Sequence, residues 1–263
     1  MNELCMITGA SAGIGMELAR GLARKKIDLV LVARSAEKLD AVRTELERDH
    51  GIRVHVYTAD LNDPVNAEAV YRKIRSDGHM ITMLVNNAGS GIYTPFAESD
   101  LEAELRMIQL NISSLVTLTK LVLPDMLASG RGRIMNIASL VSFFSYPNWA
   151  VYAATKAFVL SFTEALRAEV SDRGISVTAL CPGPIASGFM TPEMARSNAY
   201  RMNPPMSPEQ VAERGVRALL NNEGTVVVGV MNKLLIESTR ITPRAIMLRI
   251  MKYMGGGKKQ EAR

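Results

Sequence analysis

Short apolar runs alternate with longer mixed segments along most of this chain. The runs that read as strands are 3–8, 27–33, 53–58, 81–86, 133–138, 175–181 and 225–229. They are continuous in apolar residues, which is typical of strands buried on both faces of a parallel sheet. Because helical segments separate them, the pattern predicts an α/β fold: a doubly wound, seven-stranded parallel sheet with helices on both faces.

The segments between the strands supply the helices of this fold. The predicted helices span 13–25, 36–50, 64–77, 101–127, 151–172 and 208–221. Proline suits the first turn of a helix, which supports a start at Pro64. No Pro/Gly/Ser-rich linker divides the 263 residues, so we expect one domain over 1–263. Within it, 184–208 is predicted as a lid over the substrate and 230–263 as a C-terminal extension.

Composition narrows the class of protein. The chain is 48% hydrophobic and 22% charged, as in ordinary globular domains. No apolar run reaches the roughly 18–20 residues that span a bilayer, and the first strand leaves no room for a signal peptide. The net charge of +5 is mild and indicates a plain basic surface, so we expect no nucleic-acid partner.

Cysteine and histidine usage indicates neither a disulfide framework nor a metal site. Cys5 and Cys181 each sit in an apolar strand, where free cysteine behaves as a small hydrophobe. The absence of a disulfide pattern fits a reducing compartment, so we expect a cytoplasmic protein. His50, His55 and His79 are scattered without metal-ligand spacing, and we expect no metal.

A tyrosine and a lysine near the start of one predicted helix form a candidate catalytic pair. Tyr152 and Lys156 are four residues apart, which places them on one helix face. A neighbouring ammonium lowers the pKa of a phenol, and such a tyrosine can transfer a proton near pH 7. Ser139, at the end of an apolar strand, could hold a substrate oxygen against it. Such pairs are common by chance, so their weight depends on the other motifs.

The first strand–helix turn is rich in glycine. It reads Thr8-Gly9-Ala10-Ser11-Ala12-Gly13-Ile14-Gly15. Glycines let the backbone turn sharply and approach a phosphate, and the helix N-terminus offers it unpaired N–H groups. The spacing is not the usual Gly-x-Gly-x-x-Gly, and glycine also serves packing alone. Its place at the first turn of an alternating chain favours dinucleotide binding.

The end of the second strand indicates which dinucleotide binds. A site for NAD commonly has a carboxylate here, to hold the ribose 2′-hydroxyl. Instead the strand ends in Ala33 and Arg34, and the planar guanidinium can pair with a 2′-phosphate. As a plain surface residue, an arginine at a helix N-terminus would oppose the helix dipole. The sequence therefore predicts NADP(H) as cofactor.

The motifs together resemble the short-chain dehydrogenase/reductase family, as an NADP-preferring member with a Rossmann-type fold. The resemblance covers about 8–188. Its further elements are Asp60-Leu61, Asn86-Asn87-Ala88-Gly89, Asn111, Ser139, Tyr152, Lys156 and Pro182-Gly183. Each is weak alone, and together in this order they are specific. The usual threonine after Pro182-Gly183 is less clear, and Ser187 or Thr191 are the alternatives.

The resemblance implies an enzyme that interconverts a carbonyl and a secondary alcohol by hydride transfer. Its implied catalytic residues are Ser139, Tyr152, Lys156 and Asn111, the last holding a water through its backbone. Tyr152 is the acid/base, Ser139 orients the substrate oxygen, and Lys156 binds the nicotinamide ribose. The implied cofactor-binding residues are Gly9, Ser11, Gly13, Ile14, Gly15, Arg34, Asp60, Leu61, Asn87, Ala88, Gly89, Tyr152, Lys156, Pro182, Gly183 and Ile185.

The substrate is expected at the carboxyl ends of the strands. The candidate residues there are apolar: Ile92, Tyr93, Leu140, Val141, Phe143, Phe144, Tyr146 and Trp149, with Phe189, Met190, Met194, Tyr200, Met202 and Met206 from the lid. They indicate an apolar or acyl-type carbonyl compound, or merely a packed loop. Alternatives are a ketoreductase acting on carrier- or CoA-bound acyl thioesters and, less favoured, a non-catalytic NADPH-sensing scaffold.

The C-terminal extension carries one further predicted helix. Thr242 and Pro243 read as its N-cap and first residue. Met247, Ile250, Met251 and Met254 recur at helical spacing, with Arg249 and Lys252 opposite and Lys258 and Lys259 beyond. We expect this stripe to pack on its own domain or on another subunit of a homo-oligomer (dimer or tetramer). Contact with an anionic membrane is open but not favoured.

Overall fold

A seven-stranded parallel sheet forms the centre of the computed structural model, which describes residues 3–189 and 191–256. The strands are β1 (Leu4–Thr8), β2 (Asp28–Ala33), β3 (Val54–Thr58), β4 (Met83–Asn86), β5 (Gly132–Ile137), β6 (Ile175–Cys181) and β7 (Thr225–Val227). Their order is β3-β2-β1-β4-β5-β6-β7. The predicted doubly wound fold is confirmed.

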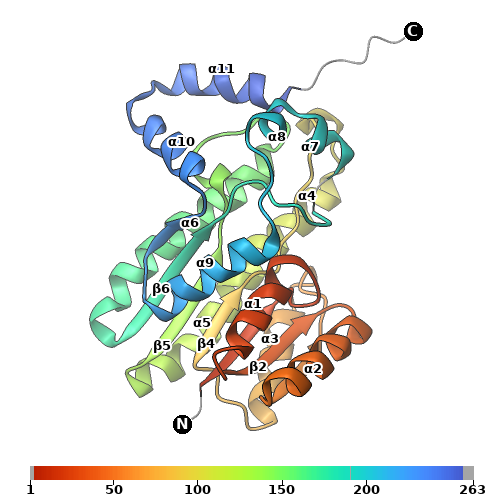
Figure 1. Cartoon of the computed structure of the whole chain (residues 1–263), viewed down its shortest axis with the longest axis vertical. Helices are drawn as coiled ribbons and strands as arrows, with labels where there is room; N and C mark the ends of the chain where they lie inside the picture. The colour runs from red at the N-terminus through yellow and green to blue at the C-terminus, as the bar shows by residue number, and fades with distance from the viewer. Residues whose placement is uncertain (1–2, 190, 257–263) are drawn as a thin grey trace.

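Helices cover both faces of the sheet (Figure 1). The helices are α1 (Gly13–Ala23), α2 (Ala36–His50), α3 (Asn66–Ser76), α4 (Leu101–Ile108), α5 (Ser114–Ser129), α6 (Ala150–Val170), α7 (Pro192–Arg196), α8 (Asn198–Met202), α9 (Pro208–Leu220), α10 (Val230–Ile241) and α11 (Arg244–Gly255). One apolar core joins the sheet to α1, α2 and α9, and a second joins it to α3, α5 and α6.

The strand order reverses direction between β1 and β4, which are neighbours in the sheet. In such a fold the crevice outside the carboxyl ends of the strands at this point binds ligands. The glycine turn follows β1 there, and Asn87 follows β4. The fold therefore brings two of the predicted cofactor motifs, far apart in sequence, to one edge of the sheet.

The predicted helix over 101–127 is correct in extent, but it is not continuous. A π-helical turn, Gln109–Ser113, separates α4 from α5. Judged by length and composition alone, the combined helix Leu101–Ser129 is long and apolar enough to cross a membrane. The sequence pattern predicted no apolar run of that length. Leu118 and Val122 in this helix are nevertheless buried against the sheet, as in a core helix.

Three helices were not predicted, and one begins later than expected. α3 begins at Asn66 rather than Pro64, because the Asp63 carboxylate accepts a hydrogen bond from the Val65 N–H in a turn that precedes the helix. The lid contains α7 and α8, whose caps are Thr191 and Ser197. The extension contains α10 before the predicted α11. Both lie at the end of the molecule away from the N-terminus (Figure 1).

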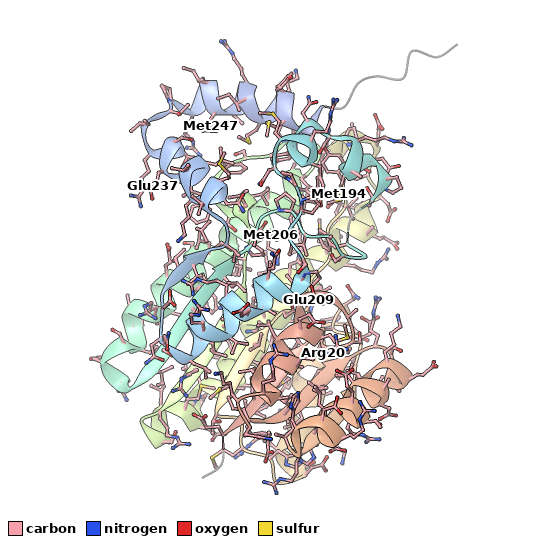
Figure 2. All side chains as sticks on the ribbon, in the orientation of Figure 1. Arg20, Met194, Met206, Glu209, Glu237 and Met247 are labelled. Atoms are coloured by element: carbon pink, nitrogen blue, oxygen red, sulfur yellow. The ribbon has the colours of Figure 1, made fainter. Side chains whose placement is uncertain are left out.

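The predicted stripe of the last helix divides into two in the structure. α11 begins at Arg244, with Pro243 as its N-cap. Met247 and Met251 are buried, whereas Ile250 is 41% exposed, so the single stripe was wrong. Figure 2 shows Met247 on α11 at the same end of the molecule as Met194 in the lid. Met190, Lys258 and Lys259 lie outside the described residues.

Candidate active site

The glycine turn after β1 is held by a side chain from the loop after β4. Gly9 has φ +66°, a conformation that favours glycine. The Asn87 amide donates to the carbonyls of Thr8 (2.9 Å) and Gly9 (3.2 Å). A β-carbon on Gly15 would lie 2.4 Å from that amide nitrogen, so only glycine fits there. The turn is thus pre-organised by residues of this chain.

Thr8 is a structural residue of the site that the sequence analysis missed. Its hydroxyl is buried and accepts hydrogen bonds from the N–H groups of Asn87 and Ala88, both at 3.0 Å. It therefore joins the loop after β4 to the end of β1. The sequence contains one signal for this role, because Thr8 is the polar residue that ends an otherwise apolar strand.

We expect Thr8→Val to destabilise the protein. Valine keeps the shape but leaves the half-buried N–H donors of Asn87 and Ala88 without an acceptor, each at the lower end of about 1–3 kcal/mol. The free energy of unfolding in urea should fall by about 2–4 kcal/mol. Thr8→Ser keeps the hydroxyl and is the matched control. Equal stability of the valine and serine variants would show that this hydroxyl does not hold the loop.

The space beside this turn fits a dinucleotide phosphate. Helix α1 starts at Gly13 without a side-chain cap, so its first N–H groups are available to a ligand. Gly13 has φ +56°, and a β-carbon added to it would meet nothing within 4 Å. Ser11 and Ile14 flank it, both half-buried. An open, uncapped helix N-terminus is the environment that favours an anionic group.

Arg34, which is predicted to pair with a 2′-phosphate, lies beside Asp60, another of the predicted cofactor-binding residues. Arg34 and Asp60 line one hollow of about 500 Å³ beyond β2 and β3. Arg34 is exposed and, among the described residues, forms no ion pair. The Asp60 carboxylate accepts from the Asn62 side chain at 2.6 Å, while Leu61 is buried. Arg34 thus has a free guanidinium at the edge where a 2′-phosphate would lie.

The structure brings Tyr152 and Ser139 together. Tyr152 lies near the start of α6, with its phenol close enough to the Ser139 side chain for that hydroxyl to lower its pKa. Ser139 follows β5, and its Oγ also accepts from the Val141 N–H at 3.3 Å. Burial raises the pKa of the Tyr152 phenol above its ordinary value, and the neighbouring Ser139 side chain lowers it in part. A buried neutral phenol is a proton donor.

Lys156 lies in the same buried region, one turn along α6 from Tyr152. Its Nζ donates to the Ile137 carbonyl at 2.8 Å and lies 5.8 Å from the centre of the Tyr152 ring. Burial lowers the pKa of Lys156 to about 8. The expected lowering of the Tyr152 pKa by this ammonium is not found: burial raises that pKa, and the group that lowers it is Ser139.

The shifted pKa of Lys156 predicts a pH dependence of stability. Above pH 8 the folded protein releases this proton, while the unfolded chain keeps it up to about its ordinary pKa of 10.5. The unfolded state then binds more protons, so stability rises with pH across this window. Relative to Lys156→Met, the cofactor-free wild type should gain about 3 kcal/mol between pH 8 and 10.5 in urea unfolding. If the stability of both proteins changes equally with pH, the pKa of Lys156 is not lowered in the folded protein.

Asn111 lies in the π-helical turn between α4 and α5. Its amide donates to the Ser90 carbonyl (2.9 Å) and to Thr155 Oγ1 (3.0 Å) and accepts from the Ser90 N–H. A β-carbon on Gly89 would approach this side chain and Lys156 Nζ at 3.2 and 3.5 Å. Asn111 thus ties the loop after β4 to α6, and π turns are frequent at functional sites.

The loop after β6 is fixed to the serine loop and to the C-terminal extension. The Pro182 carbonyl accepts from the Leu140 N–H at 2.8 Å. A β-carbon on Gly183 would lie 2.4 Å from the side chain of Asn232 in α10. Ile185 pairs with Met206 in an isolated β-bridge that closes the base of the lid.

The two candidates for the missing threonine are both engaged locally. Thr191 caps α7, where its hydroxyl accepts from the Met194 N–H at 3.3 Å. Ser187 accepts from the Phe189 N–H at 3.4 Å. Neither hydroxyl therefore stands out as the cofactor ligand.

An apolar wall surrounds the Tyr152 ring. Trp149 and Phe189 lie 4.6 and 5.6 Å from it, between ring centroids. The predicted residues that join this cluster are Ile92, Tyr93, Val141, Phe144, Tyr146 and Trp149. Others do not: Phe143 packs in a separate cluster behind β5 and β6, and Met206 packs near Ile185. Met202 is 66% exposed.

The cluster contains residues that the sequence analysis did not place there. Met107 of α4 and both buried methionines of α11 belong to it. Tyr93 Oη donates to the Gly255 carbonyl at 2.6 Å, which anchors the end of α11 beside this wall. The helical spacing of Met247 and Met251 was visible in the sequence, but their destination required the fold.

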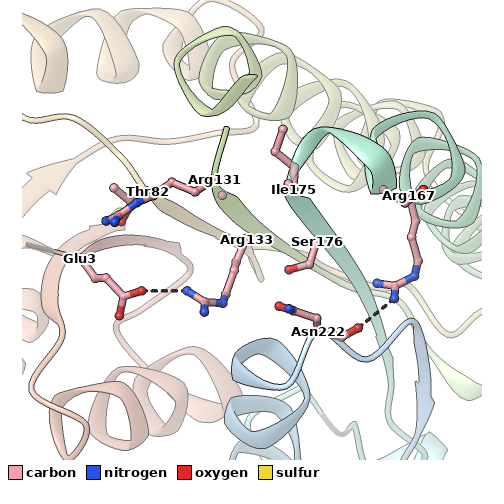
Figure 3. A pocket seen from close by; sticks show the side chains of 11 residues that line it. Glu3, Thr82, Arg131, Arg133, Arg167, Ile175, Ser176 and Asn222 are labelled. Atoms are coloured by element: carbon pink, nitrogen blue, oxygen red, sulfur yellow. Dashed lines mark hydrogen bonds and ion pairs between the residues drawn. The ribbon is translucent and has the colours of Figure 1, made fainter. Parts of the chain in front are cut away.

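A second hollow, of about 350 Å³, lies at the opposite, amino-terminal edge of the sheet. Figure 3 shows its ion pair between Glu3 and Arg133 (2.8 Å), and Arg167 bonded to the Asn222 carbonyl (2.8 Å). It contains none of the predicted catalytic residues. The chemistry of the site therefore belongs to the carboxyl edge.

Two of the histidines that looked scattered in the sequence are neighbours in the structure. The rings of His55 and His79 lie 3.9 Å apart. Burial lowers the pKa of His55, and His79 lowers it further. Within 3–189 and 191–256, no His, Cys, Asp or Glu side chains gather in groups of three that could hold a metal.

Known proteins resemble this chain in sequence and in structure. The family model described as short chain dehydrogenase matches residues 3–198. The very-long-chain 3-oxoacyl-CoA reductase of Anas platyrhynchos is 37% identical over 188 residues, which are 69% of this chain and 59% of that protein. The chain thus spans less than two thirds of that relative's length.

Solved structures match over nearly the whole chain. A short-chain dehydrogenase from Sphingobium yanoikuyae in complex with NADPH has a TM-score of 0.80 and 30% identity, covering 99% of this chain and 98% of its own. The bulky-bulky ketone specific alcohol dehydrogenase from Comamonas testosteroni has a TM-score of 0.77 and 25% identity, covering 99% and 97%.

Proposed function

The chain belongs to the short-chain dehydrogenase/reductase family, and on this premise we propose that it reduces bulky, apolar or acyl-type carbonyl compounds with NADPH. The observation that carries the proposal is the buried Tyr152–Ser139 pair under a wall of aromatic and methionine side chains. Two structural neighbours support it: the dehydrogenase from Sphingobium, which is described in complex with NADPH, and the alcohol dehydrogenase from Comamonas, which is described as bulky-bulky ketone specific.

The chain's own residues supply orientation and a proton. Bound NADPH supplies a hydride to the carbonyl carbon. The Tyr152 hydroxyl donates its proton to the carbonyl oxygen, and Ser139 Oγ donates a hydrogen bond that stabilises the charge developing there. The apolar wall with Trp149 and Phe189 keeps water from the reacting atoms. The raised pKa of the phenol keeps it protonated at neutral pH, which suits reduction.

Binding of NADPH rests on the glycine turn, the uncapped start of α1 and Arg34. Each fits the cofactor: the turn leaves space at Gly13, and the free guanidinium can pair with a 2′-phosphate. Lys156 Nζ lies near Gly89, where it can bind a ribose hydroxyl. The carboxylate expected of an NAD-binding site is missing at the end of β2.

An acyl-thioester ketoreductase is the second candidate. The lid exposes Arg196 and Arg201, cations that suit the phosphates of CoA or an acidic carrier protein. The similar reductase of Anas platyrhynchos is named for a 3-oxoacyl-CoA. On a non-catalytic, NADPH-sensing scaffold, the buried tyrosine–serine pair would have no role.

A substrate panel separates these candidates. We expect NADPH absorbance to fall with bulky free ketones and to stay constant with small hydrophilic aldehydes. Turnover only with 3-oxoacyl-CoA, and none with free ketones, would favour the thioester reductase. NADPH binding without turnover of any carbonyl compound would leave only the scaffold and overturn the proposal.

Assembly and compartment are part of the same proposal. The adjacent helices α4 and α6 expose Leu101, Leu105 and Phe158, at 68%, 55% and 40%. An apolar surface of this kind supports a homo-oligomer formed through this face. The two cysteines, Cys5 and Cys181, are free and buried, which supports a reducing, cytoplasmic compartment.

A further inference from the structure

The two C-terminal helices expose an unusual share of apolar side chains. They are Val230, Met231, Leu234, Ile241, Ile246, Leu248, Ile250 and Tyr253. Residues 3–189 and 191–256 expose sixteen large apolar side chains in all, so half of them lie within 230–255. Single exposed apolar residues are ordinary, whereas a concentration of them marks an interaction surface.

On α11 the exposed side chains form a stripe of their own. Ile246, Ile250 and Tyr253 fall within about 60° of one another around a helix with 3.6 residues per turn. Met247 and Met251 are centred about a third of a turn away and are buried in the active-site cluster. The helix therefore packs on its domain with one stripe and leaves the other to an external partner.

Helix α10 repeats this arrangement. Val230, Leu234 and Ile241 fall within about 40° of one another and are 73%, 60% and 85% exposed. Asn232 and Ile236, on the far side of the helix, are buried against the domain. Two consecutive helices thus each have an inner and an outer face. We call the two outer faces the docking surface.

The charges beside the docking surface are almost all positive. Within 230–256 the cations are Lys233, Arg240, Arg244, Arg249 and Lys252, all exposed. The one carboxylate is Glu237, which lies on α10 (Figure 2) and is paired with Arg240 at 3.1 Å. On helical geometry, Lys233 and Arg240 lie on one side of the α10 stripe, with Glu237 between them and it. On α11, Arg249 lies about 40° from Tyr253 and Lys252 about 100° from it, on the same side.

We propose that the docking surface binds the surface of an anionic lipid bilayer. Helices with an apolar stripe beside a row of Lys and Arg lie in the membrane interface, where anionic lipids attract the cations. A second copy of the chain is a poorer occupant. A two-fold interface brings the same patch of both subunits together, so these cations would face each other. The homo-oligomer must then use another face.

The docking surface lies next to the substrate side of the enzyme. Asn198 of the lid helix α8 donates to the Tyr253 carbonyl at 2.8 Å, and Tyr93 of the active-site wall donates to Gly255. A docked bilayer would therefore border the lid. If the proposed function holds, an apolar ketone reaches the site from lipid; bilayer binding itself does not depend on that function.

Vesicle co-sedimentation of the full chain tests the proposal. We expect binding to phosphatidylcholine vesicles that contain phosphatidylglycerol, little to phosphatidylcholine alone, and weakening by salt. Ile250→Ser with Tyr253→Ser, and separately Arg249→Glu with Lys252→Glu, should each weaken binding at least about tenfold. The matched control, Lys25→Glu with Met80→Ser, changes an exposed cation and an exposed methionine elsewhere.

The outcomes distinguish the membrane from other partners. NADPH affinity should be unchanged in all variants, which shows that they fold. Equal binding of wild type and both α11 variants would overturn the proposal. The proposal would also be overturned if the wild type does not bind anionic vesicles and the α11 variants have a smaller oligomeric mass than the wild type. The docking surface would then bind a second copy of the chain. A failed substrate panel combined with lipid binding would contradict only the proposed function.

Discussion

Tyr152→Phe should lower kcat by roughly 10²–10⁴-fold, the usual contribution of a general acid. The ring and its contacts with Trp149 and Phe189 remain, so the wall keeps its shape. The only loss is the hydroxyl that donates the proton and lies beside Ser139. Steady-state NADPH oxidation with a bulky ketone measures kcat, and fluorescence titration should show unchanged NADPH affinity.

A second tyrosine of the same cluster provides the control. Tyr146 is buried beside Trp149, and Tyr146→Phe removes a hydroxyl without touching the proposed acid. Its kcat should stay near that of the wild type. More than a tenth of the wild-type kcat in Tyr152→Phe, or an equal loss in both variants, would contradict the assigned role.

Ala33→Asp combined with Arg34→Ala should reverse the cofactor preference from NADPH to NADH. A charge-assisted hydrogen bond contributes about 1.5–3 kcal/mol, so loss of the guanidinium alone weakens NADPH by roughly 10–100-fold. The new carboxylate accepts from a ribose 2′-hydroxyl and repels a 2′-phosphate. The ratio of kcat/KM for the two cofactors should therefore shift by about 10²–10³-fold.

Lys38→Ala is the control for this switch. Lys38 is an exposed cation in the first turn of α2, which begins two residues after Arg34, and it does not line the hollow that holds Arg34. Its cofactor ratio should match the wild type. If the double variant also keeps the wild-type ratio of kcat/KM for the two cofactors, another residue binds the 2′-phosphate and Arg34 is only a surface residue.

Local signals explain why much of the fold could be predicted. Helix α2 has the predicted bounds because Ser35 caps its start and Gly51, at φ +61°, ends it. The continuous apolar strands and their spacing predicted the parallel sheet. The glycine turn, Arg34 and Ser139 were visible in sequence as small or polar residues at strand ends, and Tyr152 was visible by its spacing of four residues from Lys156 in a predicted helix.

Features that depend on tertiary contacts could not be read from the sequence. The π turn at Asn111 is held by Ser90 and Thr155, which are far away in sequence. Helix α10 was missed because its apolar residues lie on both its inner and outer faces, which hides the helical period. The cations of α11 were visible in the sequence, but it did not show which apolar side chains of this helix remain exposed.

A buried polar network under the site was likewise invisible. Asn86 on β4 donates to Asn136 on β5 (2.9 Å) and to Thr119 (3.0 Å), and Asn136 donates to Thr163 (2.9 Å). In sequence these amides look like interruptions of apolar strands. In the fold these hydrogen bonds join the sheet to α5 and to α6, the helix that carries Tyr152, while Asn86 Oδ1 is buried without a partner among the described residues.

The most direct test of the proposed chemistry follows the hydride. NADPH deuterated at the transferred position of nicotinamide C4 is incubated with the enzyme and a bulky ketone, and the alcohol is analysed by mass spectrometry. We expect one deuterium on the carbinol carbon of the alcohol made by the wild type, and the same label at a strongly reduced rate with Tyr152→Phe. Alcohol formed without the label, or no alcohol although NADPH binds, would contradict the proposed chemistry.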